Sequence, residues 1–181
     1  MSNYIKLSDQ MNEQKLEINH QKLNLWMENV LFDWHWWFGV IITVVAITLW
    51  LIYHERQSRV SLLLAGFIAA IISAIFDNMG QFLGWFDYRY DVFPMLPNYV
   101  PWDFVVIPII VMFTIQLFKG VNIYLKGLVL SAIVAFLAIP FLNIINIYVL
   151  IKWNAFYSFI LMYLIAMIAY HGSKISNVKS P

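Results

Sequence analysis

Residues 60–76 read VSLLLAGFIAAIISAIF, and Asp77 and Asn78 follow at once. The run holds 17 residues without a charge, close to the roughly 20 mostly apolar residues that a helix needs to cross a bilayer. Small residues recur in it at four-residue steps, a spacing that lets helix backbones approach closely in lipid. We interpret both small-residue ladders as packing surfaces within the chain, with a dimer interface as the alternative: Ala65, Ala69 and Ser73, and Gly66, Ala70 and Ala74.

Four further apolar runs lie on either side of this segment. Together with it they predict an all-α fold, an integral membrane bundle of five transmembrane helices, with four as the alternative count. The third span carries Pro108, which a membrane helix tolerates with a kink. In the fourth, Pro140 with Asn143 and Asn146 indicates that the second half is kinked or leaves the membrane. The four runs are 36–53, 104–118, 127–151 and 153–170.

The composition agrees with a membrane protein and excludes several other classes. Hydrophobic residues make up 62% of the 181 residues and charged residues only 12%, about half of the roughly 25% in soluble domains. The apolar content excludes disorder, and a net charge of +1 argues against a nucleic-acid partner. The chain has no cysteine, so it forms neither a disulfide nor a thiolate metal site. We find no catalytic, cofactor or metal-binding motif and predict no cofactor and no metal.

Three parts follow one another along the chain. Residues 1–35 are polar, and their apolar side chains recur at helical spacing, which predicts an amphipathic helix that lies on the membrane surface or covers the bundle. Residues 36–171 form the transmembrane domain, and residues 172–181 form a short polar tail. The apolar face of the N-terminal helix comprises Leu16, Leu23, Trp26, Met27 and Val30.

Lysine and arginine near the helix ends predict the orientation, because they favour the cytoplasmic side. With the N-terminus outside, six of them fall on the cytoplasmic side and three, Lys22, Arg89 and Lys152, on the outer side. We therefore expect the N-terminus outside and the C-terminus in the cytoplasm. The six are Arg56, Arg59, Lys119, Lys126, Lys174 and Lys179.

Residues 77–103, between the second and third expected spans, differ from the rest of the chain. Charges alternate with aromatic rings there, so we expect an ordered loop at the membrane interface. Gly80 and Gly84 make a formal GxxxG pair, which we interpret as allowing the chain to turn rather than as a dimer motif. Three prolines exclude a regular helix from the second half of the loop: Pro94, Pro97 and Pro101.

This loop carries the candidate functional residues. Asp77 ends its helix, where the helix dipole disfavours a carboxylate, so the side chain needs a partner. Arg89 is the only basic residue in the region and the natural candidate. Asp103 also has an ordinary role as an acid in the first turn of the third span. The predicted polar cluster comprises Asp77, Asn78, Arg89, Asp91, Asp103 and Gln116, under an aromatic lid of Trp85, Tyr88, Tyr90 and Trp102.

Three interpretations of the cluster stay open. It pins the loop onto the bundle, or it forms a polar cavity that binds a lipid headgroup, a cation or a small solute, or two of its carboxyls form a catalytic pair. For the whole protein we favour non-enzymatic binding of a membrane protein partner, a lipid or a small solute through the loop. The alternatives are a membrane-embedded enzyme and a small transporter or channel, whose path would use Asn78, Gln116, Asn143 and Asn146.

Aromatic and polar residues also form a pattern that covers most of the chain, from about residue 23 to 168. Its parts are Leu25-Trp26-Met27-Glu28-Asn29-Val30, Trp36-Trp37, Phe76-Asp77-Asn78-Met79-Gly80, Gly84-Trp85-Phe86-Asp87-Tyr88, Pro101-Trp102-Asp103 and Lys152-Trp153. The pattern resembles a family of small multi-helix membrane proteins of spore-forming Firmicutes, the bacilli and clostridia. The resemblance implies a bacterial plasma membrane and no particular activity. The fourth span of that family often carries a Glu-Pro pair, where this chain has Ile139 and Pro140.

Overall fold

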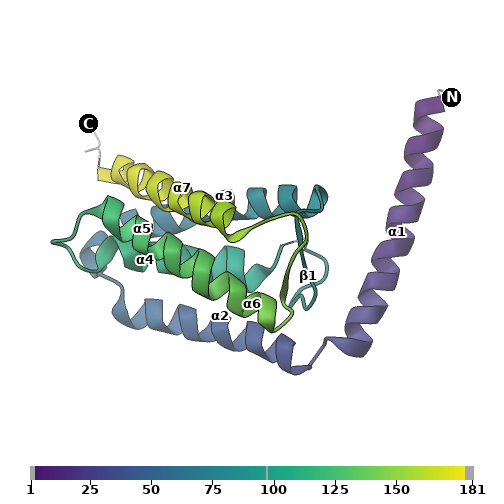
Figure 1. The fold of residues 1–181 in the computed structure, drawn as a ribbon, viewed down its shortest axis with the longest axis horizontal. Helices are drawn as coiled ribbons and strands as arrows, with labels where there is room; N and C mark the ends of the chain where they lie inside the picture. The colour runs from purple at the N-terminus through teal and green to yellow at the C-terminus, as the bar shows by residue number, and fades with distance from the viewer. Residues whose placement is uncertain (1–2, 97, 178–181) are drawn as a thin grey trace.

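The structure is a computed structural model that describes residues 3–96 and 98–177. Pro97, Lys179 and the rest of the tail from residue 178 onward, which entered the predictions above, lie outside the described residues. Helices dominate the described part, with two short strands near one end (Figure 1). In chain order the elements are α1 (Asn3–Asn29), α2 (Trp34–Tyr53), α3 (Arg59–Phe82), β1 (Phe86–Tyr88), α4 (Ile107–Gln116), α5 (Ile123–Ile133), α6 (Ile139–Ile144), β2 (Tyr148–Leu150) and α7 (Ala155–Ser173).

The spanning helices confirm the prediction of an all-α membrane bundle. Four of them are long and apolar enough to cross a membrane, by length and composition. The remaining one of the five expected spans, the third in chain order, is the shorter apolar helix Pro101–Gln116. Its 16 residues, six in a π-helical segment and ten in α4, rise about 24 Å, against a hydrocarbon thickness of about 30 Å. The four long helices are Trp34–Tyr53, Arg56–Phe82, Ile123–Ile144 and Ala155–Ser173.

Two π-helical segments interrupt the helices, and each ends two residues before a proline. The segment Pro101–Val106 precedes Pro108 in α4. The segment Val134–Ala138 joins α5 to α6 and precedes Pro140. Proline has no backbone N–H, and its ring clashes with the carbonyl four residues earlier. A local change to i→i+5 hydrogen bonds therefore accommodates the ring. The helix that was expected to kink at Pro140 continues to Ile144, and β2 follows it.

The N-terminal helix α1 stands beyond one end of the bundle and runs crosswise to it (Figure 1). None of its residues is buried, so the alternative in which this helix covers the bundle is wrong. Its contact with the rest of the chain lies near its C-terminal end, where Trp26 Nε1 donates to the Asp91 carbonyl at 2.6 Å. The other predicted position, on the membrane surface, stays a prediction, with which the crosswise direction of the helix agrees.

The spanning helices alternate in direction, so their connections gather at the two ends of the bundle (Figure 1). One end holds α1, the loop of residues 83–100 and the two strands, which pair antiparallel with Phe86 opposite Leu150. The opposite end holds the α2–α3 and α4–α5 connections and the end of α7. The sequence pattern does not reveal the strands, because each has only three residues and its partner lies far along the chain.

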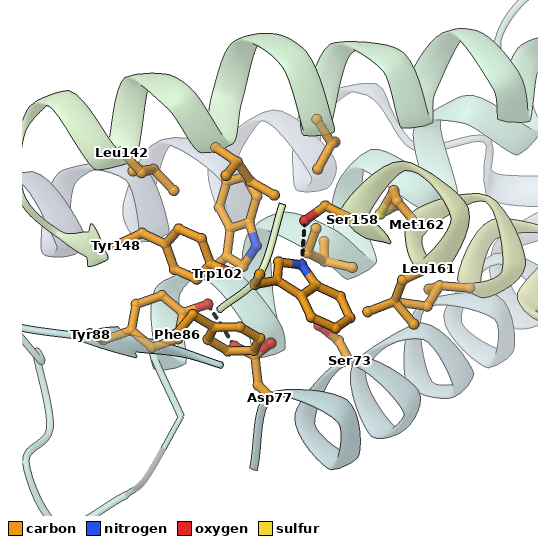
Figure 2. Close-up of a pocket in the computed structure, with 15 residues that line it drawn as sticks. Ser73, Asp77, Phe86, Tyr88, Trp102, Leu142, Tyr148, Ser158, Leu161 and Met162 are labelled. Carbon is orange, nitrogen blue, oxygen red and sulfur yellow. Dashed lines mark hydrogen bonds between the residues drawn. The ribbon is translucent and has the colours of Figure 1, made fainter. Parts of the chain in front are cut away.

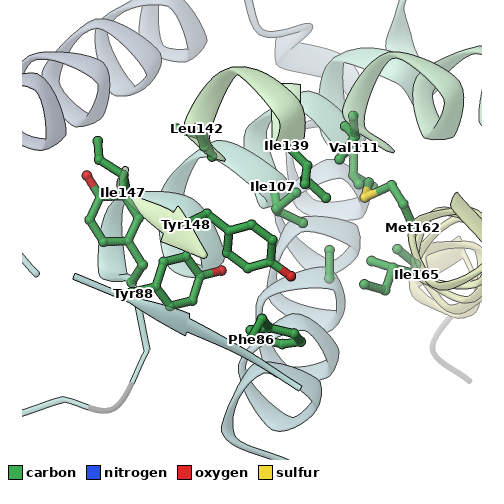
Figure 3. Packing of buried hydrophobic residues seen from close by; sticks show 14 of the residues in the cluster. Phe86, Tyr88, Ile107, Val111, Ile139, Leu142, Ile147, Tyr148, Met162 and Ile165 are labelled. Carbon is green, nitrogen blue, oxygen red and sulfur yellow. The ribbon is translucent and has the colours of Figure 1, made fainter. Parts of the chain in front are cut away.

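Tight packing joins β1 to α3. A Cβ added at Gly80 would lie 2.3 Å from Phe86 Cζ, so the aromatic ring of the strand rests directly on the helix backbone. Gly84 has a φ of +65°, which agrees with the predicted turn. Figure 3 shows Phe86, Tyr88 and Tyr148 side by side in the core that these contacts build. In the first small-residue ladder, Ala65 and Ala69 are fully buried and Ser73 is 6% exposed, which confirms packing within the chain.

Candidate functional site

Two aspartates from neighbouring helices meet inside the bundle. Asp77 lies near the end of α3, and Asp103 lies in the π-helical segment before α4, where it is fully buried. Their carboxyl groups lie close enough to interact with each other. Because two neighbouring carboxylates repel each other, a single proton shared by the two groups is favoured. The pair therefore favours one negative charge rather than two.

Neutral donors surround the aspartate pair. The Tyr88 hydroxyl donates to Asp77 Oδ2 at 2.6 Å, and the Ser73 hydroxyl donates to Asp103 Oδ1 at 2.6 Å. Asn98 Nδ2 donates to Asp103 Oδ2 at 3.2 Å. Burial raises the pKa of Tyr88 well above its ordinary value, so the phenol stays a donor. The acids are thus held by hydrogen bonds from uncharged groups.

Asn78 belongs to the same hydrogen-bond network, as the sequence predicted, but it is connected to Asp103 through the side-chain amide of Asn98. Its Nδ2 donates to Asn98 Oδ1 at 2.8 Å. Asn98 reaches this position because the loop returns to the bundle just before the π-helical segment begins, and its side chain is 4% exposed. The two amides therefore tie the end of the loop to α3.

A cavity of about 50 Å³ lies beside Asp77 (Figure 2). One water needs about 10–15 Å³ of such space, so the cavity has room for a few waters or one small ion. Asp77 and the Ser73 and Ser158 hydroxyls are among its polar lining groups. Aromatic rings, which attract cations through their electron-rich faces, make up much of the remaining wall: Phe86, Tyr88, Trp102, Tyr148 and Trp153.

Within the described ranges, no lysine, arginine or histidine forms an ion pair with Asp77 or Asp103. The predicted Asp77–Arg89 pair is wrong, because Arg89 is exposed. The reason is the alternation of side chains along a strand. In β1 and the residue after it, Tyr88 points inward to Asp77, whereas Asp87 and Arg89 point outward.

Asp91 takes part in a separate contact with α1 rather than in the cluster around Asp77. Its Oδ2 lies 2.9 Å from Lys22 Nζ, and its side chain is 5% exposed against 48% for the lysine. Burial raises the pKa of Asp91 to about 6, and the attraction of Lys22 offsets only part of that rise. This acid therefore fastens the N-terminal helix to the loop.

Gln116 lies at the opposite end of the bundle, so it does not belong to the predicted cluster. It accepts from the Glu55 backbone N–H at 3.0 Å and donates to the Tyr53 carbonyl at 2.8 Å. Asn143 donates to the backbone of β2 at 2.9 Å, and Asn146 is exposed. In the part of the chain that the structure describes, these amides do not line one path with Asn78.

Two of the four rings in the predicted aromatic lid line the cavity. Tyr88 and Trp102 do so. Trp85 instead stacks on Trp153, with ring centroids 5.1 Å apart, and Tyr90 stacks on a histidine at the start of α2, with centroids 3.5 Å apart. These two rings hold the loop and the strands in place around the cavity.

Sequence reasoning missed several residues of the site. Ser73 was assigned to a packing ladder, although its position one helical turn before Asp77 puts both side chains on one face of α3. That spacing is a signal that could have found it. Asn98, Tyr148 and Ser158 carry no such signal, because only the tertiary fold brings them to the acids and the cavity.

In comparisons with protein-family models, curated proteins and solved structures, nothing matches this chain.

Proposed function

We propose that this protein binds a small organic cation, of the ammonium or methylammonium class, in the cavity beside Asp77. One observation carries the proposal: the carboxyl of Asp77, which neighbours the buried Asp103, and a set of aromatic rings border the same small cavity. The described residues add no ion-pairing cationic side chain there. An ammonium group would supply the missing positive charge.

Physical chemistry favours this ligand class. A carboxylate away from water is costly unless an opposite charge or several hydrogen bonds compensate it. A bound cation pairs with the charge that the Asp77–Asp103 pair can carry, while the rings of Trp102 and Tyr148 contribute cation–π attraction. The volume of about 50 Å³ is too small for a lipid headgroup, one of the ligands expected for the loop.

The membrane and its orientation belong to the same proposal. We place the protein in a bacterial plasma membrane, as the resemblance to membrane proteins of spore-forming Firmicutes implies, with α1 and the cavity at the outer end. The gathering of basic residues at the opposite end supports this orientation: Arg56, Arg59, Lys119, Lys126 and Lys174. In intact cells, an impermeant thiol reagent should label Arg89→Cys but not Lys174→Cys, and the reverse would overturn the orientation.

Thermal unfolding of the purified protein in detergent tests the binding site. Methylammonium chloride at about 100 times its Kd should stabilise the protein by about 2.7 kcal/mol, a rise in Tm of about 5–10 °C for a chain of this size. Sodium chloride at equal ionic strength serves as the salt control. Asp77→Asn should abolish the rise, and Asp87→Asn, the exposed neighbour on β1, should retain it. Equal shifts with both salts, or a full shift in Asp77→Asn, would refute the proposal.

A second candidate function has its own supporting observation. A membrane-embedded enzyme needs a second ionisable group within hydrogen-bond reach of Asp77, and Asp103 meets that condition. Mass spectrometry of the amine after incubation distinguishes the two functions. A solute recovered unchanged supports binding, whereas a converted solute would assign acid–base catalysis to the pair.

A further inference from the structure

We propose a second site, for an anionic phospholipid of the surrounding bilayer, in a groove between α2, α3 and α4. The groove has a volume of about 420 Å³. Leu63, Phe67 and Phe104 line it and are exposed, so it opens onto the outside of the bundle. Because this surface belongs to spanning helices, hydrocarbon chains are what it meets in the membrane.

Small residues of α3 create the groove. Gly66 and Ala70, from the second ladder in the sequence, belong to its wall. A Cβ added at Gly66 would lie 2.9 Å from Met112 Sδ on α4, so the two helices approach closely there. The first ladder packs inside the bundle, whereas the second leaves room beside it for an acyl chain.

Trp50 has an N–H group in this groove that needs a hydrogen-bond acceptor, which hydrocarbon chains cannot supply. It lines the groove, is 8% exposed, and its Nε1 is buried without a hydrogen-bond partner among the described residues. An unpaired buried donor is costly. Trp50 lies about one turn before the end of α2, at the depth where an indole meets the polar boundary of the bilayer. We assign the ester carbonyl of a phospholipid in the groove as the acceptor.

Charge at the same end selects the headgroup. Arg59 precedes Leu63 by one turn, so it lies on the face of α3 that borders the groove. Arg59 and Arg56 are both exposed, and neither takes part in an ion pair within the described chain. The acid of this turn, Glu55, is already paired with Lys119. Two unpaired arginines beside an acyl-chain groove complement a phosphate-bearing anionic headgroup.

Native mass spectrometry in detergent, with phosphatidylglycerol and phosphatidylcholine of identical acyl chains as probes, tests the headgroup. We expect one phosphatidylglycerol per protein, bound about tenfold more tightly than phosphatidylcholine. Arg59→Gln should remove most of this preference. Arg89→Gln, an exposed arginine at the other end of the bundle, is the matched control and should keep it. Equal binding of both lipids, or equal losses in the two variants, would overturn the site.

A diether phosphatidylglycerol tests the role of Trp50, because it lacks the ester carbonyl. The wild type should bind the diester about three to ten times more tightly than the diether, the range expected for one neutral hydrogen bond. Trp50→Phe keeps an aromatic ring and should bind both equally, with its thermal transition measured to confirm folding. A wild type without ester preference would refute the carbonyl contact. A dimer that Ala70→Leu abolishes would replace the lipid with a second copy of the chain as the occupant.

Discussion

The two aspartate sites at the α1 end of the molecule have opposite surroundings. Asp91 is a buried residue of the loop, and it forms an ion pair with Lys22 of α1. Asp103 is buried inside the bundle and is paired with Asp77, which has no basic partner among the described residues. The comparison shows that burial alone does not define a role for an acid. Asp91, which has a cationic partner, attaches α1 to the loop, whereas Asp77 and Asp103 have none and form the site at which we propose that a cation binds.

The largest effect on stability is expected from the removal of Asp103, the acid inside the bundle. Asp103→Ala leaves the buried Ser73 hydroxyl without its acceptor. It also removes one of the two acceptors of the Asn98 amide, which keeps the Ala74 carbonyl. We expect a loss of about 2–4 kcal/mol in the free energy of unfolding, since unsatisfied buried donors cost about 1–3 kcal/mol each. Thermal unfolding in detergent measures it. Asp103→Asn, which keeps an acceptor oxygen, should lose clearly less, and equal losses would mean that shape rather than hydrogen bonding holds the pair.

The second-largest effect on stability is expected at the contact between Gly80 and Phe86, which positions Tyr88 beside Asp77. Gly80→Ala places a Cβ 2.3 Å from the ring of Phe86, so β1 must shift away from α3. We expect a loss of about 1–3 kcal/mol, the usual cost of overpacking, and a weaker bond from Tyr88 to Asp77. Gly120→Ala, where an added Cβ meets open space within 4 Å, is the control for thermal unfolding. Similar stability of the two variants would show that β1 does not depend on this contact.

The outer pair is expected to affect the attachment of α1 to the loop, and this effect depends on pH. Burial raises the pKa of Asp91 to about 6 from an ordinary value of about 3.9. Below about pH 6 the carboxyl takes up a proton, so the ion pair with Lys22 is lost. Between about pH 4 and 6 the folded state binds more protons than the unfolded state, and the contribution of Asp91 to stability therefore rises as the pH falls.

Hydrogen exchange of the α1 amides measures this release. We expect faster exchange near residues 19–29 at pH 5 than at pH 7, after correction for the intrinsic rate, without a fall in Tm caused by Asp91. Lys22→Gln should show fast exchange at both pH values. Protection that is independent of pH in the wild type would show that Trp26, rather than the ion pair, holds the helix.

The local pattern of the sequence was enough to predict the membrane bundle and the need of Asp77 for a partner. Apolar runs of sufficient length, the small-residue ladder at Ala65 and Ala69, and the turn at Gly84 all depend on neighbours in the chain. Such features are readable because helix formation and partition into lipid act on continuous segments.

The identity of each partner was decided only by the tertiary structure. Nearness in sequence favoured Arg89 for Asp77, but pairing with β2 fixes β1 as a strand, and its alternation turns Tyr88 inward and Arg89 outward. The link of Asp91 to Lys22 spans 69 residues, and no local pattern encodes it. The sequence determined that this chain is a membrane bundle with acids that need partners. Three-dimensional packing decided which acid meets a lysine and which meets another acid, because contacts between distant segments follow from the whole fold.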